Sequence, residues 1–113
     1  MPDATETITR LYQGLGTRDH ALMARCYAPD ATFGDPVFPD LRGDDARGMW
    51  RMLCARGEAA KLRIDAGGFR MEGDTGHAHW EADYVFTTTG RPIHNVIDAT
   101  FTFRGDRIAT HTD

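Results

Sequence analysis

Three side chains near predicted strand ends have the chemistry to exchange protons. Asp35 closes the extended segment that starts at Ala31, and His111 and Asp113 alternate in the last segment, so they share one face of a strand. Carboxyl and imidazole groups are the usual general acids and bases of enzymes. Because the alternation in the last segment fits either face, the residues alone leave open whether His111 and Asp113 point inward.

Three other histidines raise the question of a metal site. By the alternation of their segments, His77, His79 and His94 lie on the side that the apolar residues avoid. Neither Cys26 nor Cys54 has the spacing of a zinc-ligand pair. We therefore expect no metal site, and two reduced cysteines with a structural role.

Length and composition favour one compact domain over residues 1–113. The chain is 41% hydrophobic and 27% charged, which is typical of a folded protein. Thirteen Lys and Arg against seventeen Asp and Glu give a net charge of −4, without a basic cluster. Nucleic acid and membrane are therefore not expected partners. The chain has neither a targeting pattern nor a run of about 20 apolar residues, so we expect a cytoplasmic protein.

The first half of the chain has the signals of three helices. A capping box at residues 3–6 opens the first, and Asp19 can cap a second, shorter helix that Pro29 closes. After a short extended segment and a loop over residues 36–43, the apolar spacing around Met49 and Trp50 predicts a third helix that ends near Gly57.

From Lys61 the apolar period changes from about 3.6 to 2, which indicates strands. Gly67 and Gly68 suggest a bulge, and turns then separate strands over 77–88, 93–104 and 107–113. Helices followed by an antiparallel meander predict an α+β domain. Alternation predicts that one set of residues points inward: Ala78, Trp80, Ala82, Tyr84, Phe86, Ile93, Asn95, Ile97, Ala99, Phe101 and Phe103. Asp98 then points outward.

Several motifs resemble the nuclear-transport-factor-two-like superfamily, in particular its bacterial branch of polyketide cyclases and ketosteroid isomerases. They are the stretch from Tyr27 to Pro36, Gly43, Met49-Trp50, residues 79–82, 89–91 and 94–95, and the end from Arg107. The resemblance implies a cone, in which a curved antiparallel sheet of the cystatin-like kind packs on three N-terminal helices. It also implies an apolar cavity for a hydrophobic small molecule and a homodimer formed through the outer face of the sheet.

The resemblance also suggests roles for individual residues. Asp35 occupies the position of the general base of ketosteroid isomerases. Asp113 looks like the acid on the last strand of polyketide cyclases and limonene epoxide hydrolase, which turns Asp113 and His111 inward. We expect these three as catalytic groups, without metal or cofactor. The expected ligand-binding residues are Tyr12, Phe33, Trp50, Trp80, Tyr84, Asn95, Ile97 and Phe101.

Two functions remain open at this point. One is a cofactor-independent enzyme that transfers protons on a hydrophobic molecule, by isomerisation, cyclisation or hydrolysis. The other is a non-catalytic domain that binds a small molecule or serves as a dimeric scaffold. The direction of the Asp35 carboxylate relative to a cavity distinguishes them.

Overall fold

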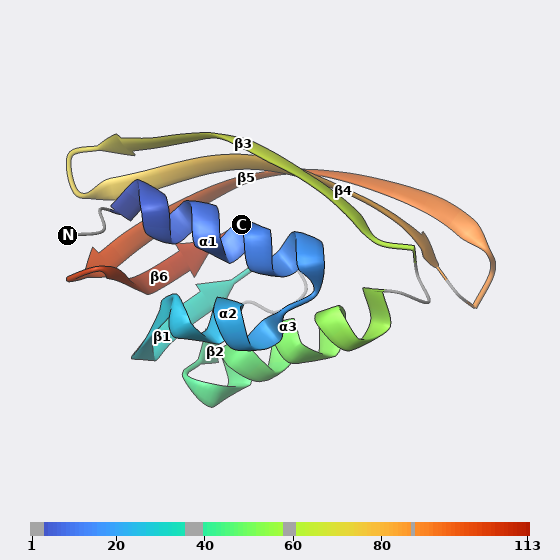
Figure 1. Ribbon diagram of the computed structural model, residues 1–113, viewed down its shortest axis with the longest axis horizontal. Helices are drawn as coiled ribbons and strands as arrows, with labels where there is room; N and C mark the ends of the chain where they lie inside the picture. The colour runs from blue at the N-terminus through green and yellow to red at the C-terminus, as the bar shows by residue number, and fades with distance from the viewer. Residues whose placement is uncertain (1–3, 36–39, 58–60, 87) are drawn as a thin grey trace.

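The computed structural model describes residues 4–35, 40–57, 61–86 and 88–113. Three helices and six strands follow one another along the chain (Figure 1). In order they are α1 (Ala4–Thr17), α2 (His20–Arg25), β1 (Tyr27–Gly34), β2 (Leu41–Arg42), α3 (Asp44–Gly57), β3 (Arg63–Glu72), β4 (Thr75–Phe86), β5 (Arg91–Arg104) and β6 (Arg107–Thr112).

The strands form one curved sheet in the order β2-β1-β6-β5-β4-β3. Strands β3 to β6 make the predicted antiparallel meander, and the predicted α+β fold with a curved sheet on three helices is confirmed. The sheet is mixed rather than wholly antiparallel, because β1 pairs with β6 in parallel. This pairing was not visible in the alternation of the strands, since the partners are far apart in the chain.

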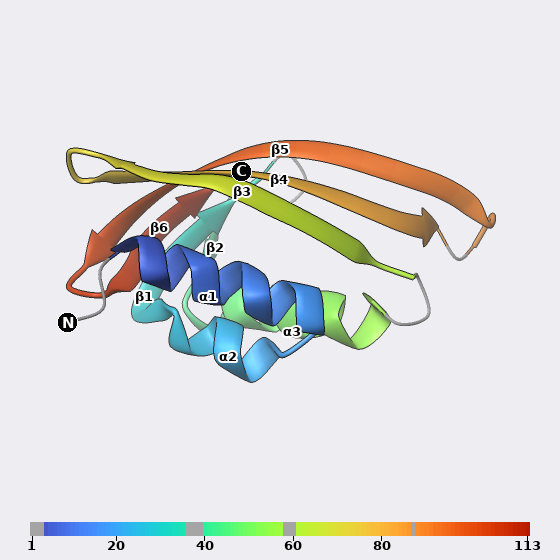
Figure 2. The ribbon, with the colours of Figure 1, turned by 45° about the horizontal axis from the view of Figure 1, so that its top comes forward.

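The helices cover the inner face of the sheet (Figures 1 and 2). Helix α1 presents Ile8, Leu11 and Leu15 at helical spacing, and all three are buried. Asp19 caps α2 as predicted, with its carboxylate accepting the N–H of Leu22 at 3.1 Å. The capping box predicted at residues 3–6 includes Asp3, which lies outside the described residues. No helix in the described ranges is long and apolar enough to cross a membrane.

Helix α2 ends at Arg25, earlier than the predicted end at Pro29, and Tyr27 opens β1 instead. The Cys26 carbonyl accepts the N–H of Ile108 at 2.8 Å, and Tyr27 is in register with Ile108. Pairing with β6 thus takes up backbone groups that a longer helix would have used.

The predicted inward faces of β4 and β5 are confirmed at Trp80, Ala99 and Phe101, which are all buried, and Asp98 points outward. The prediction was wrong for Phe86, which is 48% exposed. This end of the β4–β5 hairpin extends past the helices, so no layer covers it (Figure 1). The predicted bulge at Gly67-Gly68 is confirmed by a register shift in the β3–β4 pairing.

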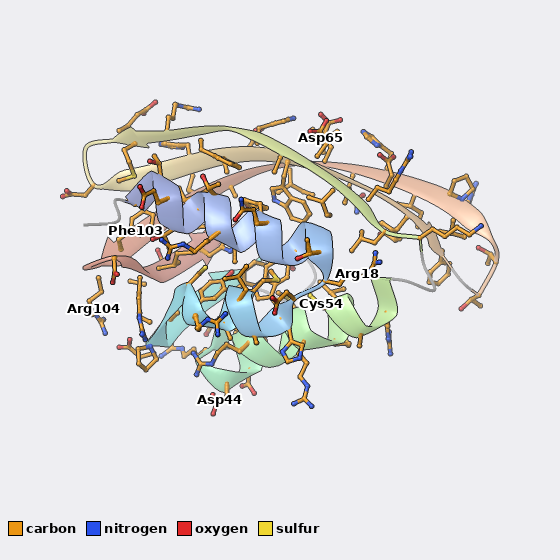
Figure 3. All side chains as sticks on the ribbon, viewed as in Figure 1. Arg18, Asp44, Cys54, Asp65, Phe103 and Arg104 are labelled. Carbon is orange, nitrogen blue, oxygen red and sulfur yellow. The ribbon has the colours of Figure 1, made fainter. Side chains whose placement is uncertain are left out.

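Both cysteines are buried and make no disulfide. Burial raises the pKa of the Cys26 thiol to about 11, an effect that Arg10 and Arg25 partly oppose. Burial also raises the pKa of Cys54, which lies between the helices (Figure 3). Both thiols are therefore protonated at neutral pH, as expected for structural cysteines.

Two glycines of α1 give a matched test of how tightly α1 and α2 pack. A Cβ on Gly14 would lie 2.8 Å from Met23 Cγ and 3.1 Å from the Asp19 carbonyl oxygen, whereas a Cβ on Gly16 would meet nothing within 4 Å. We expect Gly14→Ala to lower the free energy of unfolding by about 1–3 kcal/mol. Gly16→Ala should raise it by up to about 1 kcal/mol, because alanine is the better helix former. Urea denaturation measures both, and equal effects would contradict the packing described.

Candidate functional site

The candidate site is built where β1 and β6 end side by side. In their parallel register Phe33 pairs with His111 and Gly34 with Thr112, and the Asp113 N–H donates to the Gly34 carbonyl at 2.9 Å. Neighbouring strands lie about 4.8 Å apart, and residues in register share a face. Asp35 and Asp113 therefore follow Phe33 and His111 onto the inner face, at adjacent strand ends.

Two cavities open at this point. The larger has a volume of about 570 Å³ and is lined by Leu15, Phe33, Asp35, Met49, Trp50, Leu53, Leu62, Ile64, Trp80, Ala82, Tyr84, Asn95, Val96, Ile97 and Asp113. The smaller, of about 330 Å³, is lined by Thr32, Phe33, Gly34, Asp35, Asp40, His111, Thr112 and Asp113. Phe33, Asp35 and Asp113 belong to both walls, so the two carboxyl groups stand where the cavities meet.

A buried chain of hydrogen bonds holds Asp113. Its Oδ1 lies 2.8 Å from His111 Nε2, and His111 Nδ1 lies 2.8 Å from the Tyr27 hydroxyl. His111 and Tyr27 are 1% and 2% exposed, and the Asp113 side chain is 7% exposed. This chain of hydrogen bonds thus runs from the interior to the Asp113 carboxylate at the cavity wall.

The hydrogen-bond partners assign the protons along this chain. Burial, followed by the neighbouring Tyr12 and Asp113, raises the pKa of Tyr27 well above its usual value, so its hydroxyl keeps its proton. A buried hydroxyl that keeps its proton needs an acceptor, and Nδ1 of His111 lies within hydrogen-bond distance. We therefore assign the Tyr27 O–H as the donor to Nδ1 of His111. Nε2 then carries the imidazole proton and donates a hydrogen bond to Asp113.

Aromatic rings enclose the His111 imidazole. Its ring centroid lies 4.3 Å from that of Phe101, 4.9 Å from Phe33 and 5.9 Å from Trp50. Because these rings fill the space around it and both nitrogens have partners, the imidazole has one orientation. Its side chain is fully buried, so it can act on a ligand only through Asp113.

Three further buried polar atoms have no hydrogen-bond partner among the described residues. Trp50 and Trp80 line the larger cavity, and their Nε1 atoms are two of the three. The Tyr12 hydroxyl, behind Trp80 at a ring distance of 5.7 Å, also has no partner in this part of the chain. Burial, then the charge of Asp113, raises the pKa of Tyr12 well above its usual value. All three groups are therefore hydrogen-bond donors.

The structure brings together most of the predicted site residues. Eight of them line the larger cavity: Phe33, Asp35, Trp50, Trp80, Tyr84, Asn95, Ile97 and Asp113. The other three, Tyr12, Phe101 and His111, are buried and are not part of that wall. Asn95 is at the exposed rim, where it donates to the Tyr84 hydroxyl at 3.3 Å.

Two residues of the site, Tyr27 and Asp40, were not predicted from the sequence. The predicted second helix includes Tyr27, although this residue is in phase with Ala31 and Phe33, the signal that could have assigned it to a strand. Asp40 lines the smaller cavity and was predicted only as part of a loop.

The outer face of the sheet carries a network of histidines and carboxylates. His79 pairs with Asp98 at 2.8 Å and His94 with Asp83 at 2.6 Å, and each imidazole also contacts Glu81, at 3.2 and 2.9 Å. Asp65 also points away from the helices on this face (Figure 3), in register with Glu81. Arg104 pairs with Asp30 at 2.6 Å.

His79 is opposite Asp98 and His94 is opposite Asp83, on either side of Glu81 along the sheet. The described residues hold no group of three or more His, Cys, Asp or Glu that could bind a metal.

Comparison with known proteins agrees with this architecture. The model of the SnoaL-like domain family matches residues 8–111. No curated protein matches the chain.

Solved structures with the same fold are numerous but distant in sequence. An uncharacterized cystatin fold protein from Novosphingobium aromaticivorans is 15% identical, with a TM-score of 0.84 over 99% of this chain and 97% of that one. An NTF2-like protein from Anabaena variabilis is 21% identical, with a TM-score of 0.76 over 96% and 83%. A hypothetical protein with a ketosteroid isomerase-like fold from Catenulispora acidiphila, in complex with trimethylamine, is 16% identical, with a TM-score of 0.77 over 96% and 83%. At these identities the likeness shows the fold alone.

The outer-face network predicts a pH dependence of stability. Hydrogen bonds from Asp98 and Glu81 raise the pKa of His79, and the hydrogen bond and charge of Asp83, then Glu81, raise that of His94. Folding thus favours the protonated imidazoles. Their contribution is complete below about pH 6.5, the pKa of an exposed histidine, and is lost as pH rises through the raised values.

The double variant His79→Gln/His94→Gln should therefore melt below the wild type at pH 6 and close to it at pH 9. His20→Gln, at an exposed histidine of α2, is the control. A melting-temperature difference that stays constant across this pH range would contradict the network.

The buried chain predicts a cost for removing one hydroxyl. Tyr27→Phe keeps the ring but leaves Nδ1 of His111 without its donor, so the free energy of unfolding should fall by about 1–3 kcal/mol. Tyr84→Phe, at a half-buried tyrosine on β4, should cost about 0.5 kcal/mol or less. Urea denaturation of the two variants compares these losses, and a smaller loss for Tyr27→Phe would refute the assignment.

Proposed function

Because this chain belongs to the SnoaL-like domain family of the NTF2-like superfamily, we propose that it is a cofactor-independent enzyme that transfers protons on an apolar small molecule. The ligand lies in the larger cavity, against the ends of β1 and β6. Asp35 and Asp113 exchange protons with it, and His111 is a positioning residue. Isomerisation, cyclisation and hydrolysis all use this chemistry.

The observation that carries the proposal is the buried chain from Tyr27 through His111 to Asp113. Buried polar groups cost stability, and a protein that only needed a core could fill this space with apolar residues. Here the chain ends on a carboxylate in the wall of an apolar cavity, beside a second carboxylate on the adjacent strand. This arrangement supports proton transfer.

Each carboxyl group has a distinct support. Oδ1 of Asp113 accepts the hydrogen bond from Nε2–H of His111, which leaves Oδ2 of Asp113 for the ligand. Asp35 stands at the end of β1 with access to both cavities. Trp50 and Trp80, whose indole N–H groups are donors, line the same cavity and suit an oxygen atom of the ligand that gains negative charge as a proton leaves the adjacent carbon.

Hydrogen–deuterium exchange tests this function without knowledge of the natural substrate. We would follow by NMR the loss of the C–H signals next to the carbonyl of bicyclic and steroidal ketones in D₂O. The wild type should accelerate the exchange of at least one ketone over buffer. Asp113→Asn and Asp35→Asn should each lower the catalysed rate by about 10²–10⁴-fold, the usual contribution of a general base.

Asp65→Asn, on the outer face, is the matched control and should keep the wild-type rate. Circular dichroism verifies that each variant is folded. Exchange that survives in both cavity variants would refute the roles of Asp35 and Asp113. If ketones raise the melting temperature but never exchange, the non-catalytic binding domain is the better description.

A further inference from the structure

The larger cavity carries a pair of polar side chains at its exposed rim. Tyr84 on β4 and Asn95 on β5 both line the cavity, and Asn95 Nδ2 donates to the Tyr84 hydroxyl at 3.3 Å. Tyr84 shares a face of β4 with Ala82, which is buried and in register with Asn95. The side chains of this rim pair therefore stand on the cavity side of the sheet.

The rim pair keeps hydrogen-bonding groups for a ligand. Because the Tyr84 oxygen accepts the Asn95 N–H, the Tyr84 O–H is left to donate, and Asn95 retains its second N–H and its Oδ1. Neither side chain makes another hydrogen bond with the described residues. Asparagine is disfavoured in strands, so its place on the cavity side indicates a role for its amide.

Apolar side chains separate the rim pair from Asp113. The antiparallel register of β5 and β6 puts Asp113 level with Ala99. Asn95 is four residues from Ala99, which is about 13 Å along an antiparallel strand. Between them on the inner face, Ile97 is in register with Trp80, and both line the cavity. The wall is therefore polar at Asp113, apolar in the middle and polar again at the rim.

We propose that the rim pair binds an uncharged hydroxyl or carbonyl group at one end of an elongated apolar ligand, whose other end lies against Asp113. The oxygen of that group accepts the Tyr84 O–H, and a hydroxyl also donates to Asn95 Oδ1. The apolar body lies along Ile97 and Trp80. This proposal rests on the cavity of the proposed function and names its substrate class, apolar molecules with an oxygen at each end. It does not depend on turnover.

Matched ketones with and without a second oxygen test this substrate class. We would titrate the ¹⁵N-labelled wild type with trans-2-decalone and its 6-hydroxy derivative, and with androstan-3-one and its 17-hydroxy derivative. Chemical shifts in ¹H–¹⁵N spectra give the affinities. In at least one of the two pairs the hydroxyketone should bind about three- to tenfold more tightly than the plain ketone, which is the usual net effect of one hydrogen bond.

The same spectra report on the rim directly. The chain has one asparagine and one glutamine, so the side-chain amide signals of Asn95 are identified by their loss in Asn95→Ala. These signals should shift when the hydroxyketone binds. The side-chain signals of Gln13, which is exposed on α1, should stay in place and serve as the internal control.

Tyr84→Phe and Asn95→Ala should each remove most of the preference for the hydroxyketone and change the affinity for the plain ketone by about twofold or less. Asp65→Asn, on the outer face, should keep the preference. Circular dichroism verifies that each variant is folded. If a variant fails to fold, the affinities of the wild type and the shift of the Asn95 amide decide.

Three results would overturn the proposal: equal affinities within both pairs, a preference that survives in both rim variants, or Asn95 amide signals that do not move. A preference for the hydroxyketone together with absent hydrogen–deuterium exchange would uphold the role of the rim pair and reject the proposed enzyme. Catalysed exchange without such a preference would uphold the enzyme and reject the role of the rim pair.

Discussion

A hydrogen bond from the Tyr27 hydroxyl to Nδ1 of His111 joins β1 to β6, the one parallel pair among the described strands, and the polar side of the cavity depends on it. With Nδ1 occupied as an acceptor, the imidazole can offer only Nε2–H to Asp113. The carboxylate is thereby held at the wall, where β6 ends beside β1 and Asp35 lines the same cavity. A different tautomer would leave Asp113 facing a nitrogen lone pair, without a donor.

The energetic balance of this region explains its construction. Tyr27, His111 and Asp113 are buried among Phe33, Trp50 and Phe101, where an unsatisfied polar atom costs about 1–3 kcal/mol. The hydrogen bonds among these three side chains remove that cost for them. The indole nitrogens of Trp50 and Trp80 have no partner among the described residues.

The sequence predicted the fold well because local patterns dominate it. The change of period at Lys61, the Gly67-Gly68 bulge and the inward phase of Trp80 and Phe101 were all confirmed. The parallel position of β1 could not be predicted from local pattern, since it depends on contacts between residues about 80 positions apart. For the same reason Tyr27 was assigned to a helix, and its contact with His111 could not be foreseen. The prediction that Phe86 is buried was wrong, because alternation shows which residues share a face of a strand but not how far the helices cover that face.

The proton positions on His111 test the central claim most directly. A long-range ¹H–¹⁵N correlation spectrum at neutral pH distinguishes the two nitrogens of this buried ring, and Tyr27→Phe and Asp113→Asn assign them. We expect a protonated Nε2 and an unprotonated Nδ1, the tautomer that donates to Asp113. A proton on Nδ1, alone or together with one on Nε2, would contradict the arrangement on which the site is built.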